Sequence, residues 1–250
     1  MSEAIWASWY DLNDDGRNEN IAWINDNYLP FLKQQAGYAW AAHYRNIGPG
    51  PSLAAYHDFA GHAPDSESLE IGSQYVILVG AASTHTFLNP VFTELKMPNH
   101  FAPMLDHRKN VRNVIFAEEA RVNGPAISTR APGSTPAPAI QFGTYRIRTF
   151  EEELSLNMWY AHERFPLMSR MPGSVLTRKF VSMLGWAKHG ILYEFESLEA
   201  RTKQFEEPHE SRIVDPKAWV GKVVRSTLHT PGSPVVGERI WPPIVPSNNS

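Results

Sequence analysis

His162 is the residue whose type and position most favour catalysis in this sequence. It lies in a predicted helix, 150–171, that begins with the capping-box pattern Thr149-x-x-Glu152. A histidine titrates near neutral pH, so it could take a proton from a substrate and return it, as enolisation, elimination and decarboxylation require. The alternative is a helix-surface or buried structural histidine, and a His162→Ala variant that keeps full turnover would exclude the catalytic role.

Two tyrosines and an arginine could hold the oxygen atoms of a substrate. Tyr10 and Tyr145 occupy matching positions of two predicted strands, and a phenol can donate a hydrogen bond to a developing oxyanion. Arg178 lies on a later predicted strand and could clamp a substrate carboxylate. Core filling by hydrogen-bonded phenols is the competing interpretation of both tyrosines. Together with His162, these three residues form the predicted catalytic set.

Further aromatic and histidine side chains are candidates for substrate binding. They are Trp6, Trp40, His43, Tyr44, His57 and His62. Strand alternation alone does not decide whether His43 or Tyr44 faces inward. His57 and His62 fall in an irregular insertion, 46–72, which we expect to act as a lid over the pocket. Two histidines five residues apart without an obvious third ligand predict no metal site.

The composition limits the class of protein. Hydrophobic residues make up 42 % of the 250 residues and the net charge is −3, so the chain can bury a core and has no polybasic signature for nucleic acid or membranes. Cysteine is absent, which excludes thiol nucleophiles and cysteine-ligated metals. No signal peptide, membrane span, nucleotide-binding motif or serine-hydrolase motif is recognisable. We therefore expect a cytoplasmic enzyme that uses neither cofactor nor metal.

Two segments of the chain are alike, which predicts an internal duplication. At an offset of 136 residues, three pairs match: Trp23 with Trp159, Pro30 with Pro166, and Gly37 with Gly173. In each copy these residues follow one predicted strand and precede another, so each half is predicted to be a ferredoxin-like β-α-β-β-α-β unit. The predicted division is a first half at 1–123, a Pro/Ser/Gly linker at 124–138, a second half at 139–230 closing with a strand at 218–228, and a Pro-rich tail at 231–250.

The strand patterns predict a cavity between the two halves. Ile5, Ala7 and Trp9 suit burial beneath helices, whereas Trp6 and Tyr10 belong to the alternate set, which suits a cavity wall. A ferredoxin-like half covers one sheet face with helices and leaves the other bare. We expect the two bare faces to pack together and enclose a pocket.

This α+β arrangement resembles the dimeric α+β barrel superfamily, in particular EthD-like proteins, in a tandem single-chain form. The resemblance rests on the two strand–helix–Gly–strand units, on the run 159–162 before Pro166-Leu167, and on Pro172-Gly173. His162 precedes Pro166 by four residues, not the two typical of the family, and Asp26 stands at the matching position of the first half. The resemblance implies a barrel cavity for small apolar, often aromatic or polyketide-like molecules. It also implies relatives that are cofactor-free oxygenases, cyclases, dehydratases or isomerases, or that bind haem.

Three functions are consistent with these observations. The preferred one is a cofactor-independent lyase, dehydratase, decarboxylase or isomerase that acts by acid/base chemistry in the metabolism of aromatic compounds. The second is a cofactor-free oxygenase or a haem-binding barrel enzyme. The third is a non-enzymatic binding or stress-response barrel, which an exposed His162 and a barrel filled with side chains would favour. In each case we expect a small apolar or aromatic ligand and a monomer or homodimer.

Overall fold

Four antiparallel strands and the helices on one of their faces make up the first half of the chain. The structure, a computed structural model, describes residues 3–48, 61–62, 69–130, 135–215 and 217–244. The strands lie in the order β5-β1-β4-β2. Their bounds are β1 Ala4–Leu12, β2 Tyr38–Asn46, β4 Tyr75–Ala81 and β5 Arg108–Asn123. The helical segments are α1 Arg17–Trp23, η1 Ile24–Tyr28, α2 Leu29–Lys33, η3 Thr84–Phe87 and α4 Phe101–Leu105.

The second half repeats this order of elements. Its strands lie in the order β7-β8-β6-β9, with β6 Ala139–Ile147, β7 Ser174–Leu184, β8 His189–Phe195 and β9 Thr227–His229. Between β6 and β7 lie α5 Phe150–Trp159, η5 Tyr160–Arg164 and α6 Phe165–Met168. After β8 follow α7 Leu198–Ala200, η6 Arg201–Glu206, α8 Glu207–His209, η7 Glu210–Val214 and α9 Trp219–Ser226. A short segment, η4 Pro125–Thr129, lies between the halves.

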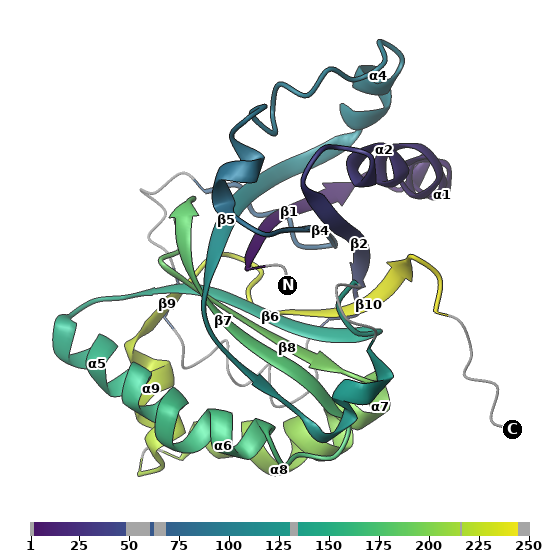
Figure 1. The fold of residues 1–250 in the computed structure, drawn as a ribbon. Coiled ribbons are helices and arrows are strands. Elements are labelled where there is room, and N and C mark those ends of the chain that lie inside the picture. The colour runs from purple at the N-terminus through teal and green to yellow at the C-terminus, as the bar shows by residue number, and fades with distance from the viewer. Residues whose placement is uncertain (1–2, 49–60, 63–68, 131–134, 216, 245–250) are drawn as a thin grey trace, which may run out of the picture.

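The two halves join into one closed barrel. β5 pairs with β7, and β10 (Val235–Trp241) pairs with both β2 and β6. The helices of the two halves lie on opposite outer sides, with the strands between them (Figure 1). The predicted fold class, two ferredoxin-like halves in one chain that form a dimeric-α+β-barrel-type structure, is confirmed.

Two segments near the C-terminus differ from the prediction. Residues 218–228, predicted as a closing strand, form α9 and the short β9. Val220, Val223 and Val224 are buried at helical spacing, and this periodicity outweighs the preference of valine for strands. Val235–Trp241, part of the predicted Pro-rich tail without periodicity, forms β10, the strand that closes the barrel.

Side chains from both halves fill the barrel interior. Phe142 of β6 packs against Trp9 of β1, Phe116 of β5 and Phe180 of β7, with ring-centre distances of 5.3, 5.8 and 6.4 Å. Gly190 of β8 leaves room for these rings, because a Cβ there would lie 2.9 Å from Phe116. The buried set is Ile5, Ala7, Trp9, Trp40, Ala42, Tyr44, Val76, Leu78, Val114, Phe116, Ile140, Phe142, Phe180, Leu192 and Val235. The expectation of a ligand cavity between the two bare faces is therefore wrong.

The predicted orientation of β1 is reversed. Ile5, Ala7 and Trp9 face the barrel interior, whereas Trp6 and Tyr10 pack beneath the helices of the first half. Both faces of this strand are buried. When both faces are buried, alternation shows that a strand is present but not which of its faces meets the helices.

Two of the matched residue pairs, the prolines and the glycines, have structural roles. In each half the helix widens to a π-helical turn, η1 or η5, directly before a short α-helix that contains Pro30 or Pro166. A proline has no N–H and clashes with the carbonyl four residues earlier, and a wider turn relieves both problems. Gly37 and Gly173 have φ of 83° and 75° in the turn that leads to the next strand, a conformation that favours glycine.

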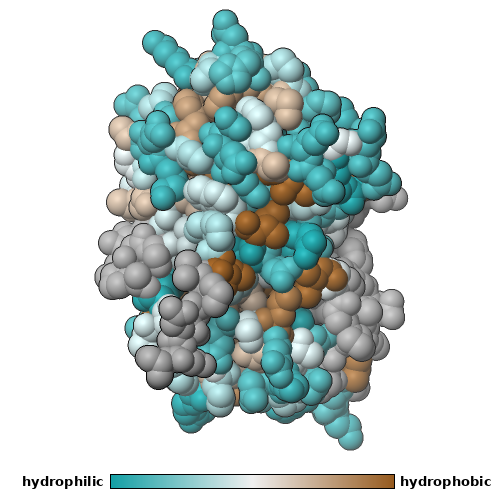
Figure 2. All heavy atoms as spheres, turned by 90° about the vertical axis from the view of Figure 1, so that its right-hand side faces the viewer, coloured by the Kyte–Doolittle hydropathy of each residue, from teal (hydrophilic) through white to brown (hydrophobic). Residues whose placement is uncertain are grey.

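Apolar side chains are exposed near the strands that close the barrel. Figure 2 shows exposed apolar side chains near the middle of the side on which β10 pairs with β2. Mostly hydrophilic side chains cover the surface above and below them in this view. Ile47, which follows β2 and donates its N–H to the Val236 carbonyl, is 47 % exposed, and Ile244, which follows β10, is 45 % exposed. In the part of the chain that the structure describes, we find no helix with the length and hydropathy to cross a membrane.

We predict that Phe142→Ala lowers the free energy of unfolding by about 3–5 kcal/mol, because it opens a cavity where both halves meet. Urea denaturation followed by tryptophan fluorescence measures this loss. Phe150→Ala is the control, because Phe150 is 74 % exposed and its loss should cost less than about 0.5 kcal/mol. Equal effects of the two substitutions would contradict the assignment of Phe142 to the shared core.

Candidate ligand-binding site

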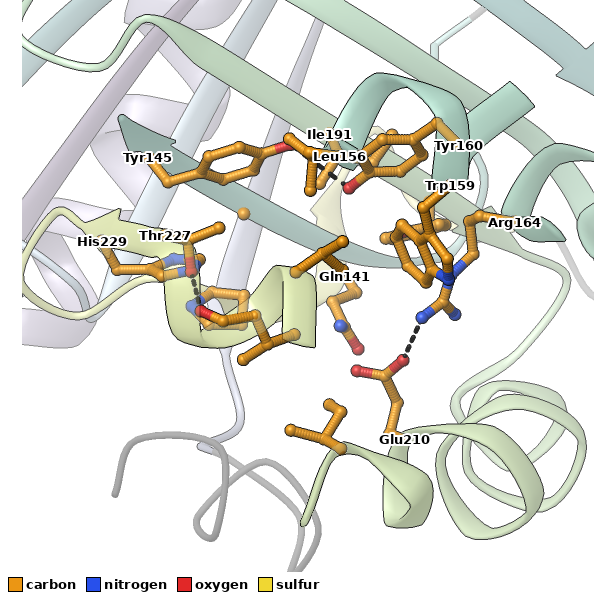
Figure 3. A pocket seen from close by; sticks show the side chains of 16 residues that line it. Gln141, Tyr145, Leu156, Trp159, Tyr160, Arg164, Ile191, Glu210, Thr227 and His229 are labelled. Carbon is orange, nitrogen blue, oxygen red and sulfur yellow. Dashed lines mark hydrogen bonds and ion pairs between the residues drawn. The ribbon is translucent and has the colours of Figure 1, made fainter. Parts of the chain in front are cut away.

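A mostly apolar pocket lies between the sheet and the helices of the second half (Figure 3). Its volume is about 50 Å³, about a third of the ~150 Å³ cavity that holds a benzene ring, so an aromatic ring enters only when lining side chains move apart. Its lining comes from β6, α5, η5, β8, η7, α9 and β9. The lining residues are Gln141, Gly143, Tyr145, Leu156, Trp159, Tyr160, Arg164, Ile191, Tyr193, Glu210, Ile213, Val223, Val224, Thr227, His229 and Pro234.

Three phenol groups meet in this pocket. The hydroxyl of Tyr145 on β6 lies 3.3 Å from that of Tyr160 on η5, and Tyr160 is also hydrogen-bonded to Tyr193 on β8. Burial raises the pKa of both Tyr160 and Tyr193 well above the usual value. Tyr160 and Tyr193 therefore stay protonated. Tyr145 donates its O–H to Tyr160, and the bond between Tyr160 and Tyr193 uses a second O–H, so the linked phenols leave one O–H to donate to a ligand.

An ion pair lies on the other side of the pocket. Arg164 of η5 donates from Nη2 to Oε1 of Glu210 at 2.9 Å, and the two side chains are only 4 % and 5 % exposed. The guanidinium lies 4.5 Å from the centre of the Trp159 ring and 4.9 Å from that of Phe205. Burial opposes the charge, but Tyr193, Glu210 and Tyr160 raise the pKa of Arg164 above its usual value, so the group stays charged. Nε and Nη1 of Arg164 have no hydrogen-bond partner among the described residues.

The remaining polar groups of the lining are held by neighbours. His229 is within hydrogen-bond distance of the Thr227 hydroxyl at 3.1 Å and of the Ser233 hydroxyl at 3.4 Å. The amide oxygen of Gln141 accepts two hydrogen bonds from Arg201, at 2.7 and 3.1 Å. What the lining offers a ligand is therefore mainly donors, namely phenol O–H and guanidinium N–H groups. Such a site suits a ligand oxygen that accepts hydrogen bonds or gains negative charge.

The pocket does not fit a haem. The macrocycle is far larger than the space available. The ring nitrogens of His229, the histidine in the lining, lie against the Thr227 and Ser233 hydroxyls. Among the described residues, no three His, Asp or Glu side chains come together as a metal site.

His162 lies outside this pocket. Its side chain is exposed on η5, two residues before Arg164, which turns inward. The π-helical turn decides which residues of this stretch meet the sheet, and it selects Tyr160 and Arg164. Of the predicted catalytic set, the structure places Tyr145 alone in the pocket lining.

Tyr10 and His43 form a buried pair in the first half. The Tyr10 hydroxyl lies 2.6 Å from Nε2 of His43, and Nδ1 of His43 lies 2.8 Å from Oδ1 of Asn25 on η1. An amide oxygen only accepts hydrogen bonds, so Nδ1 carries the proton and Nε2 accepts from Tyr10. Burial, with a smaller effect of Arg108, lowers the pKa of His43 to about 3. The pair is thus a neutral hydrogen-bonded network beneath the helices.

Arg178, Tyr44 and Trp40 lie inside the filled barrel. Arg178 is 1 % exposed and pairs with the carboxylate of Glu194 at 3.0 Å, so the carboxylate that it holds belongs to the protein. The Arg178 guanidinium lies 5.8 Å from the Trp40 ring centre. Tyr44 donates to the carbonyl of Ala137 at 2.8 Å. Of the two residues left open on β2, Tyr44 faces the barrel interior and His43 faces the helices.

The other predicted binding residues lie away from the pocket. Trp6 packs beneath the helices of the first half and donates to Oδ1 of Asn113 at 3.0 Å. His57, together with most of the expected lid at 46–72, lies outside the described residues. The backbone of His62 is in β3 (Gly61–His62), which pairs with β9.

Four important lining residues were not among the predicted site residues: Tyr160, Tyr193, Arg164 and Glu210. Tyr160 and Arg164 are four residues apart and lie between Trp159 and Pro166, so the Trp-x6-Pro repeat marks the turn that carries them. Glu210 comes from η7, a segment whose sequence shows no periodicity that would place it over the sheet.

Comparison with known proteins supports the fold. No family model and no curated protein matches the sequence. A provisionally assigned chlorite dismutase superposes with a TM-score of 0.55 at 12 % identity, covering 96 % of each chain. An anthrone oxidase-like protein gives 0.53 at 12 % identity, covering 96 % of this chain and 92 % of that one. A dye-decolorizing protein from V. cholerae gives 0.50 at 9 % identity, covering 95 % and 93 %.

These matches show that the chain has the fold of a tandem dimeric α+β barrel. At identities this low the likeness shows the fold alone. The narrower resemblance to EthD-like proteins stays a prediction.

We predict that His43 makes the protein less stable as the pH falls from 7 to 5. The pKa of this histidine is about 3 in the folded protein and about 6.5 in an unfolded chain. In that window the unfolded chain binds a proton that the folded protein does not, which lowers the free energy of unfolding by about 2 kcal/mol. In His43→Gln this part of the loss should vanish, as urea titrations at the two pH values will measure.

The control for this prediction is His162→Gln. Because His162 is exposed, this variant should keep the pH dependence of the original protein. A His43→Gln variant that loses as much stability on acidification as the original protein would show that His43 is not held neutral.

Proposed function

We propose that the chain is an enzyme that binds a small aromatic ketone, enol or phenol in the pocket of the second half. In this proposal its phenol donors stabilise negative charge on the ligand oxygen. The observation that carries it is the convergence of Tyr145, Tyr160 and Tyr193 on an apolar pocket beside the cationic Arg164. The apolar walls match the chemistry of an aromatic ring and the donors match its oxygen, and the ring enters with a movement of the lining side chains.

Stabilisation of an enolate or phenolate is the chemistry that such donors perform best. Donors that are fixed in a dry site act on charge as it develops, and each one is worth about a hundred- to a thousandfold in rate. The raised pKa values of Tyr160 and Tyr193 suit a donor and not a base. Of the lining residues, Glu210 and His229 have the side chains able to accept the proton released.

The stabilised anion leads to two kinds of reaction. Return of the proton at another atom, or loss of a neighbouring group, gives an isomerase or lyase, the reaction class preferred from the sequence. Transfer of electrons from the anion to O₂ gives an oxidation, which is our alternative. The oxidation alternative draws support from a fold shared with an anthrone oxidase-like protein and a dye-decolorizing protein. Both reactions begin with the same anion in the same pocket.

A second candidate is a binding protein without turnover. The exposed side chain of His162 and the filled barrel interior are the two features expected of that function. The pocket between sheet and helices would then hold a ligand, and no proton would move.

We predict that the protein accelerates exchange of the α-protons of acetophenone in deuterated water, and that Tyr160→Phe slows this exchange at least about tenfold. Proton NMR without oxygen measures the exchange, and an oxygen electrode in air measures oxidation. Removing one hydroxyl takes away a donor to the enolate and keeps the ring.

Two controls accompany this measurement. Tyr38→Phe removes a buried hydroxyl in the first half, and His162→Ala removes an exposed imidazole; both should exchange at the original rate. Ligand binding without exchange or oxygen uptake would favour the binding protein. Absence of binding would refute the proposed site.

A further inference from the structure

We propose that the Arg164–Glu210 pair makes this pocket select an uncharged carbonyl group and reject a carboxylate. The inference rests on the proposed function in one respect, since it takes the ligand to lie in this pocket. It goes further by assigning a second subsite with its own specificity.

Tyr145 and the Arg164–Glu210 pair lie at opposite ends of the pocket. In Figure 3 Tyr145 and Arg164 face each other across the cavity, with Gln141 between them. Tyr193 lies beside the pair, with the Arg164 guanidinium 5.6 Å from the centre of its ring. We place one oxygen of the ligand at the linked phenols near Tyr145 and a second oxygen function at Arg164. A ligand that uses both regions carries an oxygen function at each end.

The group at Arg164 must accept hydrogen bonds. Nε and Nη1 of this guanidinium are buried and have no partner among the described residues, while Nη2 is bound by Glu210. A buried donor without an acceptor is unfavourable. A ligand oxygen at this position would supply what these N–H groups lack.

The charge of the pair decides which kind of oxygen is accepted. Arg164 and Glu210 are both buried and 2.9 Å apart, so together they are neutral. A carbonyl oxygen gains charge-assisted hydrogen bonds and adds no charge. A carboxylate would lose its hydration and lie close to the Glu210 carboxylate, and a like charge at that distance is unfavourable in a buried site. Glu210 thus turns an arginine that would otherwise attract anions into a donor for neutral groups.

The same guanidinium borders a second, shallower depression at the surface. Arg164 and Trp159 line both spaces; the other residues of the depression are Glu163, Leu167, His209, Arg212 and Val220. Trp159 donates from Nε1 to Glu163 at 3.1 Å, which fixes the indole beside the guanidinium. Arg164 therefore lies between the pocket and this depression.

The test compares 4-hydroxyacetophenone with 4-hydroxybenzoate at pH 7. The two probes share the ring and the phenol, and they differ in an uncharged ketone against a carboxylate. Isothermal titration calorimetry gives both dissociation constants. We expect the original protein to bind the ketone at least about tenfold more tightly than the carboxylate.

Glu210→Gln is expected to reverse this preference. The substitution keeps the shape of the side chain and leaves the charge of Arg164 uncompensated, so the carboxylate should gain at least about tenfold in affinity relative to the ketone. Glu199→Gln is the matched control, because Glu199 is exposed and pairs with Lys203 away from this pocket. It should keep the original preference.

A double variant covers the case in which Glu210→Gln fails to fold. Arg164→Gln with Glu210→Gln keeps the pocket neutral, and it should weaken ketone binding about tenfold because the guanidinium donors are lost. Equal or tighter binding of the carboxylate by the original protein, or an unchanged preference in Glu210→Gln, would overturn the inference while leaving the pocket itself in place. Failure of both probes to bind the original protein would overturn the proposed function and this inference together.

Discussion

The packing of aromatic rings inside the barrel is the interaction on which the rest of the structure depends. Trp9 and Phe116 from the first half meet Phe142 and Phe180 from the second. Each sheet thereby buries the face that its own helices leave bare, and β10 closes the ring by pairing with both halves. This face is used for stability, and the pocket described above lies elsewhere, between a sheet and its helices.

The two halves use the space beneath their helices in different ways. In the first half Tyr10, His43 and Asn25 fill it with a neutral hydrogen-bonded network. In the second half a pocket stays open between Tyr145 and Arg164. Tyr28 and Arg164 occupy equivalent positions of the two π-helical turns, so one repeated backbone feature carries a phenol in one half and a guanidinium in the other.

The candidate site could be predicted only in part. The position of Tyr145 on the first strand of the second half predicts it as a site residue, and it does line the pocket. Arg178 matches the residue type needed to hold a carboxylate, but the carboxylate that it holds is Glu194 within the barrel. Sequence spacing gives the type and the strand of such residues. It does not give the partner that a distant strand brings to them.

By itself the sequence determined the duplicated ferredoxin-like order, because the Trp-x6-Pro and glycine spacing is a local requirement of the helix and the turn that follows it. Only the tertiary structure decided which face of each strand meets the helices, since both faces are buried and alternation does not distinguish them. It also decided that Tyr160, Arg164 and Glu210 share one pocket. Contacts between residues 46 positions apart, such as that of Arg164 with Glu210, depend on how complete elements pack and not on any local pattern.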